Sequence, residues 1–333
     1  MGLFGKKPAP ATPRTKPVPP PAPIAITGLG IACHAGDQPH NLIRSIIGQV
    51  SGVRLSEEHQ IPSDDGSKIA MARMAPVVEF GDMSERERMY QLTTIALTNA
   101  AAQLPANVKP ESVLIVVMVA PEFVTRFDKI DTGHLQNYLK EEIQSLDTVT
   151  FRILLNDVNA GSSALQAALA ELNEGKWQAI LFGGADSLIS MDKCLELDEA
   201  KRLNTVGKRD GIVPGEAAAF VVLQTKDEAD KNSTPILAYL RGMGVAAEPN
   251  ARNADLGATE GLSNAINQAL TQAGITATEV QGIVHNLGVH VDPLKGGVVA
   301  ARGAKLTLRA SERRASHTRK SWRNSIQRVD NSL

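Results

Sequence analysis

The sequence predicts an α/β fold, and three observations lead to this expectation. Short apolar runs that suit strands alternate with longer runs of helix-forming residues along the chain. The apolar run from Val113 to Ala120 is typical of a strand that is covered on both faces, and its eight residues are too few to cross a bilayer. A glycine pattern, Gly28-Leu-Gly-Ile-Ala32, recurs as Gly242-Met-Gly-Val-Ala246, which indicates a duplicated unit.

The elements follow from local patterns, taken in chain order. We expect the first strand at 24–27, a Gly-Leu-Gly turn after it, and a helix at 41–47 that Gly48 closes. Strong helix formers fill 162–174, and Gly175 stands where a left-handed terminator belongs. The other predicted helices are 84–104 and 132–144, and the other predicted strands are 113–119, 150–155, 179–182 and 217–223.

The repeat extends beyond the glycines. In each copy a helix and then a strand follow: 92–103 and 113 onward in the first, 262–272 and 280–285 in the second. The helix sequences Ala-Leu-Thr-Asn-Ala-Ala (96–101) and Ala-Ile-Asn-Gln-Ala-Leu (265–270) share one pattern. The sequence therefore predicts two related α/β halves.

Composition changes at both ends of the chain. Eight of the sixteen residues from Pro8 to Pro23 are proline, which favours a stiff, solvated leader over 1–23. Residues 295–333 hold ten basic and two acidic residues, about +8, whereas the preceding 294 residues hold 25 basic and 34 acidic residues, about −9. We expect a first half at 24–232, a partial second half at 233–294 and a basic tail at 295–333.

The overall composition excludes several classes of protein. A net charge of −1 does not suggest nucleic-acid binding, and 43% hydrophobic content over 333 residues is enough for a large core. Two cysteines, Cys33 and Cys194, are too few for a disulfide framework or a thiolate metal site, so we expect a cytoplasmic protein without a metal. The third glycine of a dinucleotide motif would fall on Cys33, so we expect no bound nucleotide cofactor.

Five short stretches resemble the β-ketoacyl synthases (3-oxoacyl-ACP synthases) of the thiolase-like superfamily. They are Ile26–Ala32, Gln49–Val53, Asp157–Ala168, Gly183–Asp186 and Asp210–Leu223. The resemblance implies duplicated α/β halves in an αβαβα layering, with the second half incomplete. It also implies a role in fatty-acid or polyketide synthesis, with phosphopantetheine supplied by a carrier protein or a CoA thioester.

The position of the family's reactive cysteine holds no thiol in this chain. A condensing enzyme places its nucleophile at a helix start, where backbone N–H groups stabilise a thiolate and an oxyanion. The resemblance puts this position on Val158, on Asn159 or on Ser162, depending on the alignment. Ser162 and Ser163 are also typical of residues that cap or pack a helix start.

The resemblance also assigns a histidine that polarises the substrate carbonyl. His285 matches its place after a predicted strand, although its neighbours differ from the family pattern, and His285 could equally be an ordinary strand-end residue. The family's later lysine, glycine-rich segment and second histidine are absent after Leu294. We therefore expect a degenerate subunit, similar to a chain-length factor. The alternatives are an acyltransferase or hydrolase that uses Ser162 or Ser163 with His285, and a non-enzymatic module that binds carrier protein.

The block from Asp210 to Glu216 resembles a family segment in which the acid and the glycines organise a turn near the site, so the resemblance implies structural roles for Asp210 and Glu216. Lys208 and Arg209 lie just before it and could contact a phosphopantetheine phosphate or an acidic carrier protein, or could simply lie on a solvated loop. The resemblance implies an acyl carrier protein as partner, and a homodimer or heterodimer with a ketosynthase.

The abrupt change near Lys295 makes a prediction about the gene. Apolar periodicity ends and arginine enrichment begins at one point, so we expect a shifted reading frame or a truncation after Leu294. Resequencing tests this, and an alternative frame that restores a glycine-rich segment and a second histidine is the expected result. An uninterrupted frame without those motifs in any other frame would instead favour a basic arm for an anionic partner.

Overall fold

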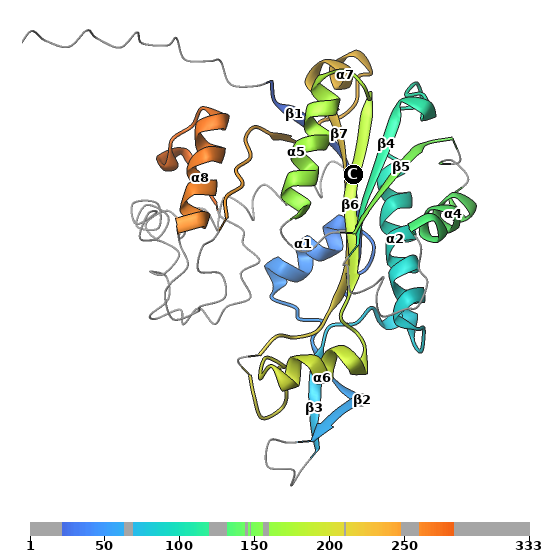
Figure 1. The fold of residues 1–333 in the computed structure, drawn as a ribbon, viewed down its shortest axis with the longest axis vertical. Helices are drawn as coiled ribbons and strands as arrows, with labels where there is room; N and C mark the ends of the chain where they lie inside the picture. Colours follow the sequence, from blue (N-terminus) through green and yellow to red (C-terminus); the bar gives the residue numbers. More distant parts are fainter. Residues whose placement is uncertain are drawn as a thin grey trace, which may run out of the picture.

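The computed structural model describes residues 22–62, 69–119, 132–143, 146, 148–155, 160–209, 211–247 and 260–282. A six-stranded sheet in the order β5-β4-β6-β7-β1-β8 forms its centre (Figure 1). The strands β4, β5 and β6 are parallel, whereas β7 is antiparallel to β6 and β1, and β8 is antiparallel to β1. The strands are β1 (Ile24–Cys33), β4 (Val113–Val119), β5 (Thr150–Leu155), β6 (Ala179–Ser187), β7 (Glu216–Thr225) and β8 (Ala238–Leu240).

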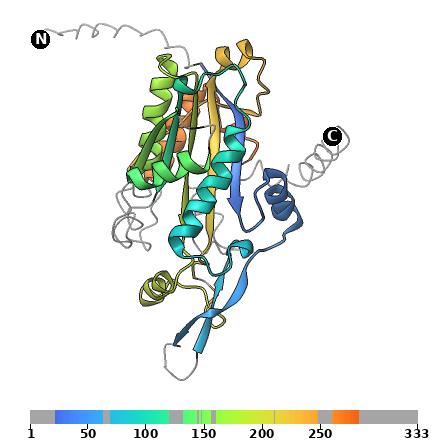
Figure 2. The same cartoon turned by 90° about the vertical axis from the view of Figure 1, so that its right-hand side faces the viewer.

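Helices cover both faces of this sheet, which gives three layers (Figure 2). Alternate side chains of β4 enter two different cores, because successive residues of a strand point to opposite faces. Val113, Ile115 and Val117 pack with α2 (Glu85–Ala101) and α4 (Thr132–Glu142). Leu114 and Val116 pack with α5 (Ala160–Asn173) on the other face. The sequence-based prediction of an α/β fold is confirmed.

The glycines of the first motif lie inside β1, so the predicted turn at Gly28-Leu-Gly30 is wrong. A Cβ atom on Gly30 would come within 1.8 Å of the Ala96 carbonyl oxygen on α2. The glycines are needed because the backbone of α2 crosses the strand closely, and not because the chain turns. The Gln103 side chain adds hydrogen bonds to both backbone groups of Leu29, donating to the carbonyl oxygen at 2.6 Å and accepting from the N–H at 3.2 Å.

The second copy of the motif repeats this arrangement with α8 (Glu260–Ala273). A Cβ atom on Gly244 would come within 1.9 Å of the Ala265 carbonyl oxygen, as Gly30 does with Ala96. The N–H of Met243 donates to Oε1 of Gln272 at 2.6 Å, as Leu29 does to Gln103. These two equivalent contacts agree with the alignment of 96–101 with 265–270.

Most predicted boundaries shift by a few residues. The first helix, α1 (Pro39–Gly48), includes Gly48, and Gln49 takes the left-handed conformation instead. The predicted terminator Gly175 is confirmed by its φ of +73°. The strands β6 and β7 continue past their predicted ends because their residues stay paired in the sheet. Residues 280–282 of the predicted strand 280–285 are described and form no strand. The leader to residue 21, residues 283–285 and the tail lie outside the described residues.

A small module below the main sheet was not predicted from the sequence. The hairpin of β2 (Arg54–Pro62) and β3 (Ile69–Met74) packs with α6 (Met191–Glu199), as Figure 1 shows. Its core contains Ile61, Met74, Cys194 and Leu197. The charged residues in this stretch hide its alternation, so the period-two signal was too weak to predict the strands.

A buried ion pair joins this region to the main sheet. Glu216, at the start of β7, accepts hydrogen bonds at 2.7 Å from both the Arg88 guanidinium and the Val77 N–H. Its second oxygen accepts from the Ser187 hydroxyl at 3.0 Å. Arg88 also donates to backbone carbonyls on the loop before α2. Glu216 therefore connects α2, β6 and β7, which agrees with the structural role expected for it.

This pair predicts a large loss of stability when one partner is removed. Arg88→Met should lower the free energy of unfolding by about 3 to 5 kcal/mol, because the Glu216 carboxylate then stays buried without a countercharge. Chemical denaturation measures the change. Lys226→Met is the control: it removes a solvent-exposed pair with Asp230 and should change stability far less. Equal losses in the two variants would contradict a structural role for the Arg88 pair.

Candidate functional site

The start of α5 is the candidate site, and the sheet places it at a chemically useful position. The parallel strands β4, β5 and β6 end at the same edge of the sheet, and α5 follows β5. Ligands of open α/β sheets bind outside the carboxyl ends of such strands. The helix start also directs free backbone N–H groups to this edge, which favours a developing negative charge. Residues 156–159, directly before the helix, lie outside the described residues.

The two candidate serines lie in the first turn of α5. Ser162 and Ser163 are both exposed. No hydrogen bond of either side chain is found in the described part of the chain, so neither serine is held by a base there. Val158, Asn159 and His285 lie outside the described residues, as does Asp210. The expected pairing of Ser162 with His285 therefore stays a prediction, because His285 lies outside the described residues.

Neither cysteine is placed to act as the nucleophile. Cys33 ends β1 and its Sγ donates weakly to the Gly36 carbonyl oxygen at 3.6 Å. Cys194 lies in α6 with no exposed surface, and this burial raises the pKa of its thiol to about 11. A thiol with this pKa is almost wholly protonated near neutral pH and is a poor nucleophile. Both cysteines are buried free thiols, as the sequence indicated.

One serine and one histidine do form a hydrogen bond, but in the hairpin module. Ser56 Oγ lies 2.8 Å from His59 Nδ1, and the same oxygen accepts the His59 N–H at 3.3 Å. Both contacts close a local turn where the β2–β3 register shifts. Burial lowers the pKa of His59, while nearby Glu58 opposes the shift. The Ser56–His59 pair stabilises this local turn in β2, and it does not belong to the candidate site at the start of α5.

A groove of about 940 Å³ lies between α5 and α8. Leu169 and Gln166 of α5 form one wall, Asn267 and Gln268 of α8 form the other, and Met243 belongs to the connecting segment. Neither Ser162 nor Ser163 contributes to it. Sequence reasoning missed this groove because its walls come from the two different halves. In the described part of the chain no cluster of three or more metal-ligating side chains is present, and no helix could cross a membrane.

Basic residues gather on the loop between α6 and β7. Arg202 and Arg209 are exposed. Hydrogen bonds within the loop hold it together, such as that from the side-chain Nδ2 of Asn204 to the Arg209 carbonyl oxygen at 2.8 Å. Lys208 Nζ, in contrast, donates to the Lys201 carbonyl oxygen. Of the two basic residues that the sequence singled out, Arg209 is therefore the one that projects to solvent.

Comparison with known proteins identifies relatives of this chain. Residues 159–229 match the model of the β-ketoacyl synthase N-terminal domain. A spectinabilin polyketide synthase protein from Streptomyces orinoci is 30% identical over 155 residues, which is 41% of this chain and 6% of that protein. A mitochondrial protein of Schizosaccharomyces pombe, named as a 3-oxoacyl-[acyl-carrier-protein] synthase, is 24% identical over 325 residues, covering 83% of this chain and 75% of that protein. The chain thus spans only a small part of the polyketide synthases it matches.

Solved structures share the fold at low sequence identity. One is a ketosynthase of a type II polyketide synthase in complex with its acyl-carrier protein: TM-score 0.66, 16% identity, 86% of this chain and 78% of that chain covered. Another is the ishigamide ketosynthase/chain length factor: TM-score 0.58, 18% identity, 78% and 72% covered. A β-ketoacyl synthase from Burkholderia phymatum gives a TM-score of 0.59 at 19% identity, with 86% and 78% covered. The fold is thiolase-like, as expected from the motifs.

The buried cysteines predict that the chain does not acylate itself on sulfur. Incubation with a labelled acyl thioester, followed by peptide mapping, should leave Cys33 and Cys194 unlabelled, because neither lies at the α5 start and Cys194 is protonated. Alkylation of Cys33 and Cys194 after unfolding in denaturant is the control that both cysteine peptides are recovered in the map. A stoichiometric label on either native cysteine would show that the α5 start is not the site.

A cysteine introduced at Val158, Asn159 or Ser162 should show which of these residues occupies the position of the family's reactive cysteine. Asn159→Cys or Val158→Cys should gain acylation, because a thiol just before the first turn meets the free N–H groups, which lower its pKa. Ser162→Cys should not, since residue 162 lies within the turn and its side chain is exposed. Treatment of each variant with a labelled acyl thioester, followed by peptide mapping, shows which introduced cysteine is acylated. Acylation of Ser162→Cys alone would favour the alignment that places the family's cysteine at Ser162.

Proposed function

Because the chain belongs to the ketosynthase family of the thiolase-like superfamily, we propose that it serves acyl-chain synthesis of the fatty-acid or polyketide type as a partner subunit. In this proposal it does not perform condensation by itself. The observation that carries it is the start of α5. Residues 156–164 contain no cysteine, and both native cysteines are buried elsewhere. A helix start without a thiol can still stabilise negative charge, but it cannot form the acyl-thioester intermediate.

The partner we propose is a cysteine-bearing ketosynthase. The edge strand β5 supports this choice, because it pairs only with β4 and its second edge has no neighbouring strand in the described part of the chain. An open edge readily pairs with a strand of another chain. Arg152 of β5 is held by Glu171 of α5 at 3.0 Å, so the edge is fixed against the helix that carries the candidate site. One solved relative is described as a ketosynthase/chain length factor.

A carrier protein is the second proposed partner, because it would deliver the acyl chain on phosphopantetheine. This group is substrate here and not a resident cofactor. Arg202 and Arg209 present positive charge on one loop, which suits an acidic partner. The cytoplasm is the compartment we propose, since reducing conditions keep Cys33 and Cys194 as free thiols.

Co-expression with a ketosynthase from the same organism tests the proposed function. The two chains should purify together, and amide exchange in β5 should slow in the complex, whereas exchange in α7 (Lys226–Lys231) should not change. Condensation of acyl and malonyl thioesters should require the partner. Condensation by this chain alone would overturn the proposal, and labelling of Ser162 or Ser163 by a serine-directed probe would instead favour the acyltransferase or hydrolase alternative.

Charge reversal tests the carrier contact separately. Arg202→Glu combined with Arg209→Glu should weaken binding of an acidic carrier protein by about tenfold or more, and added salt should reduce the difference between variant and wild type. Lys226→Glu, on the exposed surface of α7, is the matched control and should bind as the wild type does. Binding unaffected by the double reversal would place the carrier contact elsewhere.

A further inference from the structure

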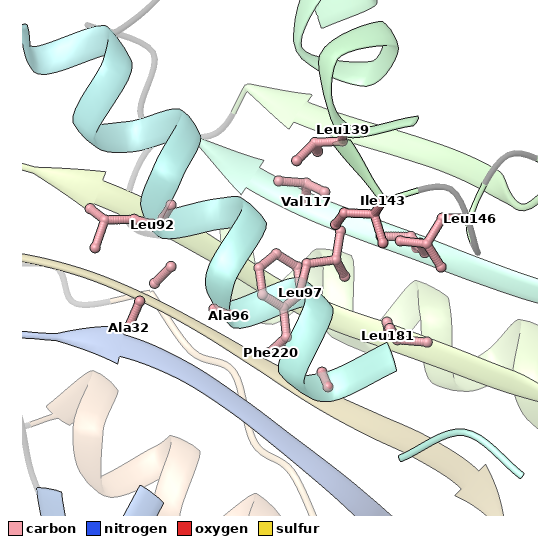
Figure 3. Packing of buried hydrophobic residues seen from close by; sticks show 14 of the residues in the cluster. Ala32, Leu92, Ala96, Leu97, Val117, Leu139, Ile143, Leu146, Leu181 and Phe220 are labelled. Carbon is pink, nitrogen blue, oxygen red and sulfur yellow. The ribbon is translucent and has the colours of Figure 1, made fainter. Parts of the chain in front are cut away.

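The edge strand β5 is less buried than the strand beside it. Val117 of β4 has no exposed surface and lies in the core with Leu139 and Ile143, as Figure 3 shows. Residues 151–154 of β5 are half-buried instead. In the described part of the chain β4 has a strand on each side, whereas β5 has one on one side. The side chains of β5 would therefore contact those of a strand added at this edge.

The two faces of β5 carry different side chains. Phe151 and Ile153 pack with the core on the face that α2 and α4 cover. Arg152 and Leu154 alternate with them and lie on the face of α5, where the Arg152 guanidinium binds the Glu171 carboxylate. The Arg152 side chain is nevertheless 34% exposed. A cation therefore lies on the α5 face of the edge, within reach of an added strand.

The charge of Arg152 is only partly neutralised within the chain. The Glu171 carboxylate lies 3.0 Å from Arg152 and 3.1 Å from Lys176, and it accepts the Trp177 indole N–H at 2.8 Å. The Trp177 hydrogen bond, followed by those of Lys176 and Arg152, lowers the pKa of Glu171, so the carboxylate is ionised near neutral pH. Because two cations share one carboxylate, one positive charge remains at this place.

A second copy of this chain would bring two such charges together. A homodimer uses the same surface on both chains, and a two-fold axis perpendicular to the sheet joins two copies of β5 as antiparallel strands. Residues directly opposite in such a pair have side chains on the same face. In the registers that pair most of β5, Arg152 is therefore opposite or diagonal to its own copy, with Cβ atoms within about 8 Å. Like charges at this spacing disfavour the pair.

We propose that Arg152 selects the partner of β5: it disfavours a second copy of this chain and favours a ketosynthase strand that carries a carboxylate opposite or diagonal to it. This inference rests on the proposed function, in which β5 pairs with a cysteine-bearing ketosynthase. The carboxylate of the partner would supply the second countercharge that Arg152 and Lys176 lack, because Glu171 is the one they share.

The salt dependence of two equilibria is the first test, and it needs no variant. Analytical ultracentrifugation measures self-association of the full chain and its complex with the cysteine-bearing ketosynthase. Added sodium chloride should strengthen self-association, because it screens two like charges, and should weaken the complex, because it screens opposite charges. A homodimer that does not strengthen with salt, or a complex that does not weaken, would overturn the proposal.

Removing the charge should move the two equilibria in opposite directions. Arg152→Met keeps the aliphatic stem, and Lys176 and Trp177 still hold Glu171. This variant should strengthen self-association by about tenfold or more and weaken the ketosynthase complex by about tenfold or more. Arg152→Lys keeps the charge and should behave as the wild type does. Lys226→Met, which removes an exposed cation of α7, is the matched control and should change neither equilibrium.

The opposite directions distinguish partner selection from a general loss of structure, which would weaken both associations. Circular dichroism checks that each variant keeps its helices. Self-association of Arg152→Met that is no stronger than that of the wild type would contradict the proposal. A ketosynthase complex that Arg152→Met leaves unchanged would contradict this proposal alone. The absence of any complex with the wild type would contradict the proposed function, and the proposal with it.

Discussion

The buried carboxylate of Glu216 is the interaction on which the arrangement of the first half depends. A charge without exposed surface is tolerated only when its partners replace water, and three donors from three parts of the chain converge on it. Arg88 thereby fixes one end of α2, and Gln103 fixes the other against Leu29. These two anchors are about 22 Å apart along a helix of standard rise. Between them Gly30 lets the helix lie directly on the strand.

The second half repeats the glycine contact but not the ion pair. In the same helix alignment, the position equivalent to Arg88 is Gly257, which has no side chain to hold a buried carboxylate. Side-chain hydrogen bonds of Gln268, Gln272 and Arg241 tie α8 to the segment 241–247, and Arg241 donates to the Ala273 carbonyl oxygen at 3.1 Å. The first half is thus anchored by a buried ion pair, whereas the described part of the second half keeps the glycine contact without that anchor.

Sequence reasoning predicted the parts of the fold that local patterns determine. The strand Val113–Val119 and the helix that ends before Gly175 were predicted because an apolar run and a left-handed glycine are local signals. The β2–β3 hairpin was missed, since its core forms only against α6. The role of the glycines in β1 was misread because their constraint comes from Ala96, about seventy residues away, which no local pattern contains. The placement of the family's reactive cysteine at Val158 or Asn159, and the role of His285, depend on segments that the structure does not describe.

The open edge of β5 gives a physical account of how this chain would behave with partners. β5 ends the main sheet on one side, and within the described residues its outer edge pairs with no other strand. Unpaired edges favour association with any compatible strand, so proteins usually cover or charge them. A partner that binds only the folded chain stabilises it by mass action, and the gain increases with partner concentration. A partner strand that pairs with β5 would therefore link the stability of the chain to partner binding.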